Sequence, residues 1–373
     1  MIKKIKIIII IFIFSFTLCG CWDYQDIDKR SIVISLGVDR VKDQIEFSTE
    51  VAKLADKSGE SNEVYTDVSK GSNFEEARRD FNAKRPYSTF LGATRIVVFG
   101  QEYAKEGIEP YLNRINRIYD YRKTLLGVVS KDTPIKLFKK KAKNDLSIGF
   151  LLEHSINSLS GEGIAIYTDI GDMMSDISFG DIGYMLPYVG VEDDSVKYLG
   201  IAIMKDSKLI AVVDKNDTAG ILYLSGKNPK LMEVITDELG ENNSISFKTR
   251  IRKKKINTYY ENNKVSINID LELDAELQYL YYIMRITPSE SEKLEKLVSN
   301  QVERQIFTIV KKTQEDYKCD IFGFAKYFKS QHFKEYKNIN WQKEYPNIEI
   351  NVDVKTKIVN KNLQDLNVKE KYR

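Results

Sequence analysis

The chain has 373 residues, 42% of them apolar and 30% charged, which is the composition of a globular protein of two or three domains. The 57 basic and 54 acidic side chains leave a net charge of +3, and this small surplus argues against nucleic acid as the main partner. Only His154 and His332 are present, so histidine-based catalysis and a histidine-rich metal site are not expected.

Residues 1–20 have the anatomy of a signal peptide. Three lysines lie among the first six residues, and an apolar run from 7 to 18 follows. As a helix this run would extend about 18 Å, short of the ~30 Å hydrocarbon core, so a cleaved signal is favoured over a membrane span.

Leu18, Cys19, Gly20 and Cys21 look like a bacterial lipobox, in which an aliphatic residue and two small residues precede the lipidated cysteine. Cleavage is expected between Gly20 and Cys21, and a diacylated Cys21 would become the mature N-terminus. Two acyl chains anchor a protein stably, so we expect it on the outer face of the cytoplasmic membrane. An ordinary signal peptide with two chance cysteines is the alternative.

Cys319 would then be the only thiol of the mature chain, so no intramolecular disulfide is expected. A partly buried small side chain is favoured over a reactive thiol.

Between residues 31 and 141, short apolar strands and amphipathic helices alternate. The expected strands are 31–38, 44–51, 94–99 and 124–129, and the expected helices are 72–84, 104–118 and 134–141. Ser72 and Glu75 predict a capping box, while Gly107 and Pro110 predict a break in the second helix. This order favours a sheet with helices packed on it.

Residues 161–183 contain five glycines and are expected to form a long loop or linker. None of these glycines stands in a strand–glycine–helix motif, so a phosphate cradle is not expected. A hairpin is predicted from 198–204 and 209–214. The acidic triplet 192–194 lacks the spaced ligands of a calcium loop and is interpreted as a solvated turn.

Residues 265–277 alternate strictly, with every odd position apolar, which predicts a long half-buried strand. The segment before it, 245–254, alternates apolar with basic residues, while the outward face of the second strand is acidic. We expect cross-strand ion pairs, and matching the two patterns requires an odd-length loop or a bulge. Contact of the lysines at 253–255 with lipid headgroups is the alternative.

Thr287, Pro288 and Glu290 form the best helix start in the chain, and the apolar stripe that follows predicts a helix to about 318. The stripe is interpreted as a core face against the sheet. Residues 347–359 alternate again and predict a last long strand.

These patterns predict an α+β protein of several domains, with mixed sheets, packed helices, and a C-terminal domain of long antiparallel strands plus a long helix. The expected divisions are an N-terminal domain at 21–190, a small middle β region at 191–228, a C-terminal domain at 229–366 and a frayed tail at 367–373. No catalytic, cofactor or metal motif is present.

The start Cys21-Trp22-Asp23, the strand at 32–39 and the segment 95–108 resemble the Ger(x)C family, the lipoprotein C-subunits of spore nutrient germinant receptors. Pro187 and residues 200–202 also fit. The C-terminal block is similar to the family's ending in order and spacing, at Tyr317, 320–324, Trp341, 345–346 and 348–354. Cys19 and Cys319 depart from the family pattern.

The resemblance implies a three-domain, non-enzymatic receptor subunit without a cofactor, in which Cys21 is the only functional residue. Its partners would be membrane lipid and two integral membrane subunits, an A-type and a B-type, in the spore inner membrane. A small nutrient ligand is unassigned. The alternative functions are a solute-binding lipoprotein of a transport system, which the pattern of 245–359 fits less well, and an enzyme, for which no motif is present.

Overall fold

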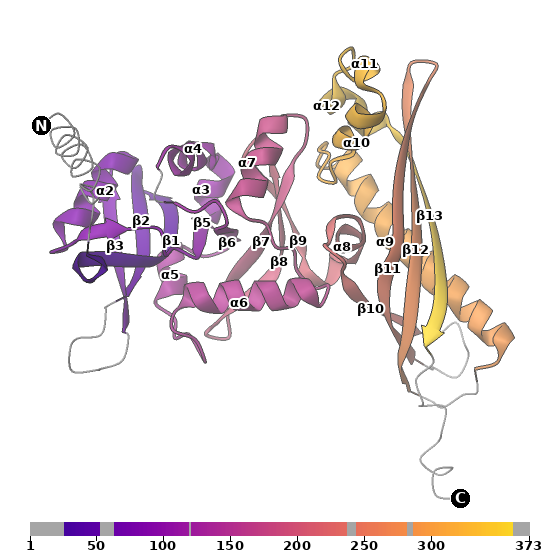
Figure 1. Ribbon diagram of the computed structural model, residues 1–373, viewed down its shortest axis with the longest axis horizontal. Coiled ribbons are helices and arrows are strands. Elements are labelled where there is room, and N and C mark those ends of the chain that lie inside the picture. Colours follow the sequence, from indigo (N-terminus) through magenta and orange to yellow (C-terminus); the bar gives the residue numbers. More distant parts are fainter. Residues whose placement is uncertain (1–25, 53–62, 119–120, 237–243, 282–285, 361–373) are drawn as a thin grey trace, which may run out of the picture.

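The computed structural model describes residues 26–52, 63–118, 121–236, 244–281 and 286–360. Two halves lie side by side, each built on one sheet, with the N-terminal half from indigo to magenta and the C-terminal half in orange and yellow (Figure 1). The predicted α+β class, with long C-terminal strands and a long helix, is confirmed.

The first half contains a nine-stranded sheet in the order β3-β2-β1-β5-β6-β7-β8-β9, with β4 beside β1. Its centre is parallel and both ends are antiparallel. The strands are β1 (Arg30–Val41), β2 (Gln44–Ala52), β3 (Val64–Gly71), β4 (Ser88–Phe90), β5 (Ile96–Gly100), β6 (Leu126–Ser130), β7 (Tyr184–Glu192), β8 (Ser195–Lys205) and β9 (Lys208–Asp214).

Helices cover both faces of the parallel centre, which explains why β5 is a continuous apolar run. Ile96 and Val98 pack with α5 and α6, whereas Val97 and Phe99 pack with α3 and α4 on the other face. Figure 1 shows α6 on the opposite side of the sheet from α3, α4 and α7. The helices are η1 (Ile27–Lys29), α2 (Phe74–Ala83), α3 (Gln101–Glu106), α4 (Glu109–Arg117), α5 (Pro134–Phe138), α6 (Ile148–Gly161) and α7 (Ile170–Phe179).

The N-terminus of α2 lies one residue later than the sequence predicts. The side chain of Asn73, not of Ser72, accepts the hydrogen bonds from the backbone N–H groups of Glu75 and Glu76. Ser72 instead donates from its hydroxyl to Glu76, 2.7 Å away. The predicted capping box of Ser72 and Glu75 is therefore wrong. Asn73 is an equally good cap, and it directly precedes Phe74, the first residue of the helix.

The glycine-rich stretch at 161–183 is not one long loop, and that prediction is wrong. It contains α7, whose N-cap Asp169 accepts a hydrogen bond from the backbone of Asp172, and which ends at Gly180 with φ 86°. These two caps stabilise both ends of the helix.

The second half is a four-stranded sheet in the order β10-β11-β12-β13, with β12 and β13 parallel. Its strands are β10 (Lys230–Thr236), β11 (Ser244–Glu261), β12 (Lys264–Leu280) and β13 (Glu349–Asn360). Asn262 and Asn263 join β11 to β12 with φ of 50° and 59°, which suits a two-residue turn.

The hairpin register shifts between Ile251 and Lys253, so of the two expected alternatives, an odd-length loop or a bulge, the structure has the bulge. Odd residues of β11 face the core before the shift and even residues face it afterwards. Lys254 consequently points inward, and its Nζ donates to the carbonyl oxygen of Leu224, 2.7 Å away. The prediction that Lys254 belongs to the outward basic ladder is wrong, because the bulge moves it to the other face.

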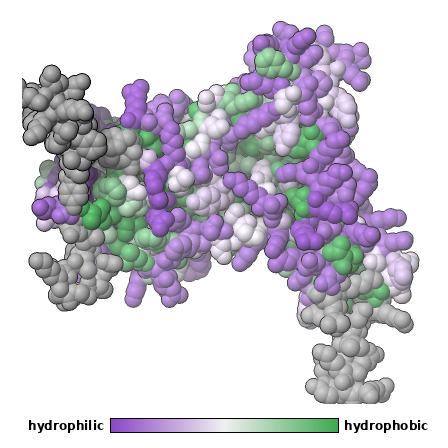
Figure 2. Space-filling model, in the orientation of Figure 1, coloured by the Kyte–Doolittle hydropathy of each residue, from purple (hydrophilic) through white to green (hydrophobic). Residues whose placement is uncertain are grey.

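The remaining ladder forms the predicted cross-strand ion pairs. Arg250 lies 3.0 Å from Asp274, and Arg252 lies 2.7 Å from Glu272. Figure 2 shows that the visible face of this half is largely hydrophilic, with only isolated apolar spots.

Helix α9 (Pro288–Glu315) packs across this sheet and begins at the predicted capping box of Thr287 and Glu290. Leu294, Val298 and Val302 are buried along the predicted stripe. The other helices of this half are η2 (Lys215–Asp217), α8 (Ala219–Ser225), α10 (Phe324–Gln331), α11 (Phe333–Tyr336), α12 (Trp341–Glu344) and η3 (Tyr345–Asn347).

The two halves share apolar contacts. Ile201 and Ile203 of β8 belong to the same core as Ile221 of α8. Strands β8 and β9, from the expected middle region, pair within the first sheet. The divisions proposed near residues 190 and 228 stay a prediction.

Candidate functional site

Gly20 and Cys21, the predicted cleavage and lipidation residues, lie outside the described residues, as does the tail at 367–373. The lipid anchor therefore stays a prediction. Among the residues that the structure describes, no helix is both long and apolar enough to cross a membrane.

The two histidines do not form a joint site. His154 of α6 lies 3.1 Å from Asp145, which precedes that helix, and His332 lies 2.8 Å from the carbonyl oxygen of Thr258 in the second half. Within the described ranges, no group of three His, Cys, Asp or Glu side chains is placed to hold a metal ion.

Cys319 is buried, and this burial raises the pKa of its thiol to about 12. Such a thiol is protonated at neutral pH and a poor nucleophile. The interpretation of Cys319 as a small buried side chain agrees with this environment.

The acidic triplet at 192–194 forms a tight turn. Asp193 and Asp194 have φ of 48° and 60°, and they form ion pairs with Lys197 and Lys140. Their carboxylates are thus paired with lysines in the solvated turn that the sequence predicts.

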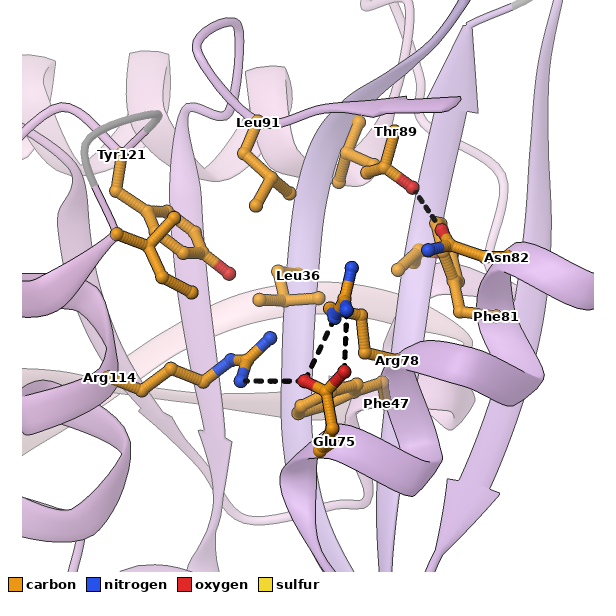
Figure 3. A pocket seen from close by; sticks show the side chains of 13 residues that line it. Leu36, Phe47, Glu75, Arg78, Phe81, Asn82, Thr89, Leu91, Arg114 and Tyr121 are labelled. Atoms are coloured by element: carbon orange, nitrogen blue, oxygen red, sulfur yellow. Dashed lines mark hydrogen bonds and ion pairs between the residues drawn. The ribbon is translucent and has the colours of Figure 1, made fainter. Parts of the chain in front are cut away.

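One hollow lies in the first half, and we call it the N-terminal pocket. It has a volume of about 440 Å³. Its walls come from β1, β2, α2, the β4 region and α4, together with Ile118 and Tyr121. Figure 3 shows Leu36 and Leu91 on the apolar side of the pocket, with Glu75, Arg78 and Arg114 drawn together below them and Phe47 behind Glu75.

An aromatic cluster supports the floor of this pocket. The ring of Phe47 lies 5.8 Å from that of Tyr111, and Phe74 lies 5.4 Å from the same tyrosine. The hydroxyl groups of Tyr111 and Tyr121 are 2.9 Å apart and share a hydrogen bond. Edge-to-face packing of this kind holds the ring positions, so the pocket has a largely preformed wall.

The polar end of the pocket contains two guanidinium groups and one carboxylate. Arg78 donates from Nε to Glu75 at 3.0 Å, and this hydrogen bonding lowers the pKa of Glu75. The Nη1 atom of Arg114 is 3.9 Å from the same carboxylate, beyond hydrogen-bonding distance. A guanidinium beside an apolar cavity is suited to recognising a planar anion.

The sequence does not single out Glu75, Arg78 or Arg114 as site residues, although the helix cap at the start of α2 bears on the position of Glu75. The sequence pairs Glu75 with Ser72 in a helix cap, whereas in the structure Asn73 caps the helix and Glu76 accepts a hydrogen bond from the backbone N–H of Ser72. Glu75 is thereby free to face the two arginines. The shift of one residue in the cap thus decides which carboxylate enters the pocket.

A second hollow of about 410 Å³, the central hollow, lies between the halves. Lys326 of α10 forms an ion pair with Asp176 of α7 across it, at 2.5 Å. Lys254 also lines it, and burial lowers the pKa of this lysine. These polar contacts help to join the two halves.

Two family models match the chain. "Spore germination protein N-terminal domain" matches residues 23–191, and "Spore germination B3/GerAC like, C-terminal" matches residues 199–362. The boundary between them falls within the β7–β8 hairpin of the first sheet.

Curated proteins of Bacillus subtilis are similar over nearly the whole length. Spore germination protein B3 is 23% identical, with 92% of this chain and 94% of that protein covered. Spore germination protein KC is 22% identical over the full length of both.

The crystal structure of the GerBC protein superposes with a TM-score of 0.59 at 20% identity, covering 87% of this chain and 97% of that one. That likeness supports the fold, while the two family models cover most of the sequence. The chain belongs to the Ger(x)C, or GerAC-like, family of spore germination proteins.

Proposed function

We propose that the chain is the lipid-anchored C-subunit of a spore germinant receptor, a non-enzymatic component that is needed for receptor assembly and nutrient-triggered germination. The observation that carries this proposal is the match of both family models across residues 23–362, apart from a short gap. The relatives named as spore germination proteins support it over nearly full length.

The partners in this proposal are integral membrane subunits of the A and B types in the spore inner membrane. The near-balanced charge supports a protein partner rather than nucleic acid.

The anchor in this proposal is a diacylated Cys21 on the outer face of the membrane. Asp26, where the described chain begins, is five residue steps from Cys21. An extended chain spans at most about 3.6 Å per residue, so Asp26 would lie within about 18 Å of the anchor. The N-terminal half would then be the part nearest the lipid.

Affinity purification of the tagged chain from spore inner membranes, with mass spectrometry of its partners and N-terminal peptide, tests the proposal. We expect two polytopic subunits and a diacylated Cys21. Cys21→Ala is expected to lose the lipid, while the matched Cys19→Ala variant keeps it. A lipidated chain recovered alone or with a transport ATPase would contradict receptor membership and favour a solute-binding lipoprotein, and an unmodified N-terminus would contradict the anchor.

A further inference from the structure

The N-terminal pocket combines an apolar body with an incompletely satisfied cationic end. Its apolar lining consists of Val33, Leu36, Phe47, Phe81, Leu91 and Ile118. The charged groups of the lining are Arg78, Arg114 and Glu75, so the lining carries a net charge of +1. A site of this kind favours a ligand with an apolar part and one negative charge.

Arg114 is the group that lacks a full set of partners. Its side chain is only 15% exposed, compared with 48% for Arg78. Arg78 donates two hydrogen bonds to the carboxylate of Glu75, at 3.0 and 2.5 Å. Arg114 is left with a contact of 3.9 Å to Glu75, and its buried Nε has no hydrogen-bond partner.

A buried N–H group without an acceptor is costly, and the cost is removed when an acceptor arrives. Figure 3 shows the guanidinium of Arg114 extending toward the interior between Tyr121 and Glu75. A carboxylate in the pocket would supply oxygens in the plane of that guanidinium, which is the geometry of strong arginine–carboxylate pairs.

We propose that the N-terminal pocket binds a small monocarboxylate, with its apolar body against Leu36, Phe47 and Leu91 and its carboxylate on Arg114. The volume of about 440 Å³ lies in the usual range for small-molecule pockets. The aromatic support through Tyr111 gives the pocket its shape before a ligand arrives, so little ordering is needed on binding. This binding site goes beyond the proposed receptor assembly and does not depend on it.

The test is isothermal titration calorimetry of the full mature chain in lipid nanodiscs, with empty nanodiscs as the blank. The probes are phenylacetate, 4-methylpentanoate and hexanoate, each compared with its neutral amide. We expect saturable 1:1 binding of at least one acid, at least tenfold tighter than its amide. If none of the three acids binds saturably, or if acid and amide bind equally, the proposal is wrong.

Arg114→Gln and Arg117→Gln form a matched pair on α4, because Arg117 is exposed and does not line the pocket. Arg114→Gln is expected to weaken binding of the acid at least tenfold and to leave binding of the amide unchanged. Arg117→Gln is expected to leave the affinity for both unchanged. Equal losses in the two variants would overturn the proposal. If Arg114→Gln does not fold, Leu91→Trp replaces it, since it fills the cavity and is expected to abolish binding. Unchanged binding in that variant would also overturn the proposal.

Discussion

The indole Nε1 of Trp341 donates a hydrogen bond to the Oδ2 atom of Asp320, 3.1 Å away, although the two residues are 21 positions apart. The same carboxylate accepts hydrogen bonds from the backbone N–H groups of Phe322, Phe324 and Ala325. Asp320 thus accepts hydrogen bonds from the first N–H groups of α10 and joins this helix to Trp341 of α12. The C-terminal block that resembles the family ending is therefore organised around one buried carboxylate.

Asp320→Asn is expected to destabilise the protein. Every partner of Asp320 is a donor, and both Ala325 and Trp341 donate to Oδ2. An amide places its NH₂ group against one set of these donors and leaves buried groups unsatisfied. We expect a loss of about 1–3 kcal/mol in the free energy of unfolding, measured by urea denaturation.

The control for this change is Asp316→Asn at the exposed end of α9. A surface substitution of this kind is expected to stay within about 0.5 kcal/mol of the wild type. An Asp320→Asn variant as stable as this control would show that the carboxylate does not organise the turn.

Asp39 makes a contrasting prediction about pH. Burial, and then the charges of Glu46, Glu102 and Glu106, raise its pKa from 3.8 to about 6. Between about pH 4 and pH 6 the folded protein keeps this proton while the unfolded chain has lost it. The contribution of Asp39 to the free energy of unfolding therefore falls as the pH rises through this window.

Asp39→Asn is expected to stabilise the protein at pH 7.5 by on the order of 1 kcal/mol, because it removes a buried charge. The Oδ1 atom accepts one hydrogen bond, from the backbone of Arg40 at 2.8 Å, and an amide oxygen can keep it. Denaturation at pH 4, 5, 6 and 7.5 measures the change, with the exposed Asp43→Asn as control. A variant less stable than the wild type at pH 7.5 would refute this prediction.

Thr287→Ala is expected to lower stability by about 1 kcal/mol. Thr287 and Glu290 exchange side-chain to backbone hydrogen bonds of 3.3 and 2.7 Å at the start of α9. The matched control is Thr308→Ala, at an exposed position of the same helix, where alanine is the better helix former. Urea denaturation of both variants measures the change in the free energy of unfolding. A loss in Thr287→Ala no larger than that in the control would rule out the cap as a source of stability.

Gly183→Ala is expected to lower stability by about 1–3 kcal/mol through crowding. An added Cβ would lie 2.5 Å from Sγ of Cys319 and 2.6 Å from the carbonyl oxygen of Met204. The N–H of Gly183 also donates to the carbonyl oxygen of Asp320, 2.9 Å away, which links the halves. Gly161→Ala, where a Cβ would meet nothing within 4 Å, should be neutral in the same thermal-unfolding measurement. Similar melting temperatures for the two variants would argue against a tight contact at Gly183.

The C-terminal half was the more predictable part of the fold. Strict alternation in β12 and the opposed charges of β11 and β12 predict the hairpin, and the change of parity requires an odd-length loop or a bulge, which the structure places near Arg252. Thr287 and Glu290 predicted the start of α9. These are local signals, because each depends on residues close together in the sequence.

The pocket and the joining of the two halves were not predictable in this way. Glu75 lies on α2 and Arg114 lies on α4, and β4 and β5 come between these helices in the sequence. Only the tertiary packing therefore brings the two side chains together. The sequence does not predict α7, because a stretch with many glycines is typical of a loop. In the structure the helix lies between its caps at Asp169 and Gly180. Strands β3 and β10 were missed too; each lies at the edge of its sheet.

We propose that the chain is a subunit of a nutrient receptor, and germination of spores that lack it tests this most directly. Loss of absorbance would be followed with single nutrients, in deletion spores and in spores complemented with the wild type or the Cys21→Ala variant. We predict that at least one nutrient response is lost, that the wild type restores it, and that Cys21→Ala restores it poorly. Deletion spores that respond normally to every nutrient of the parent strain would contradict the account.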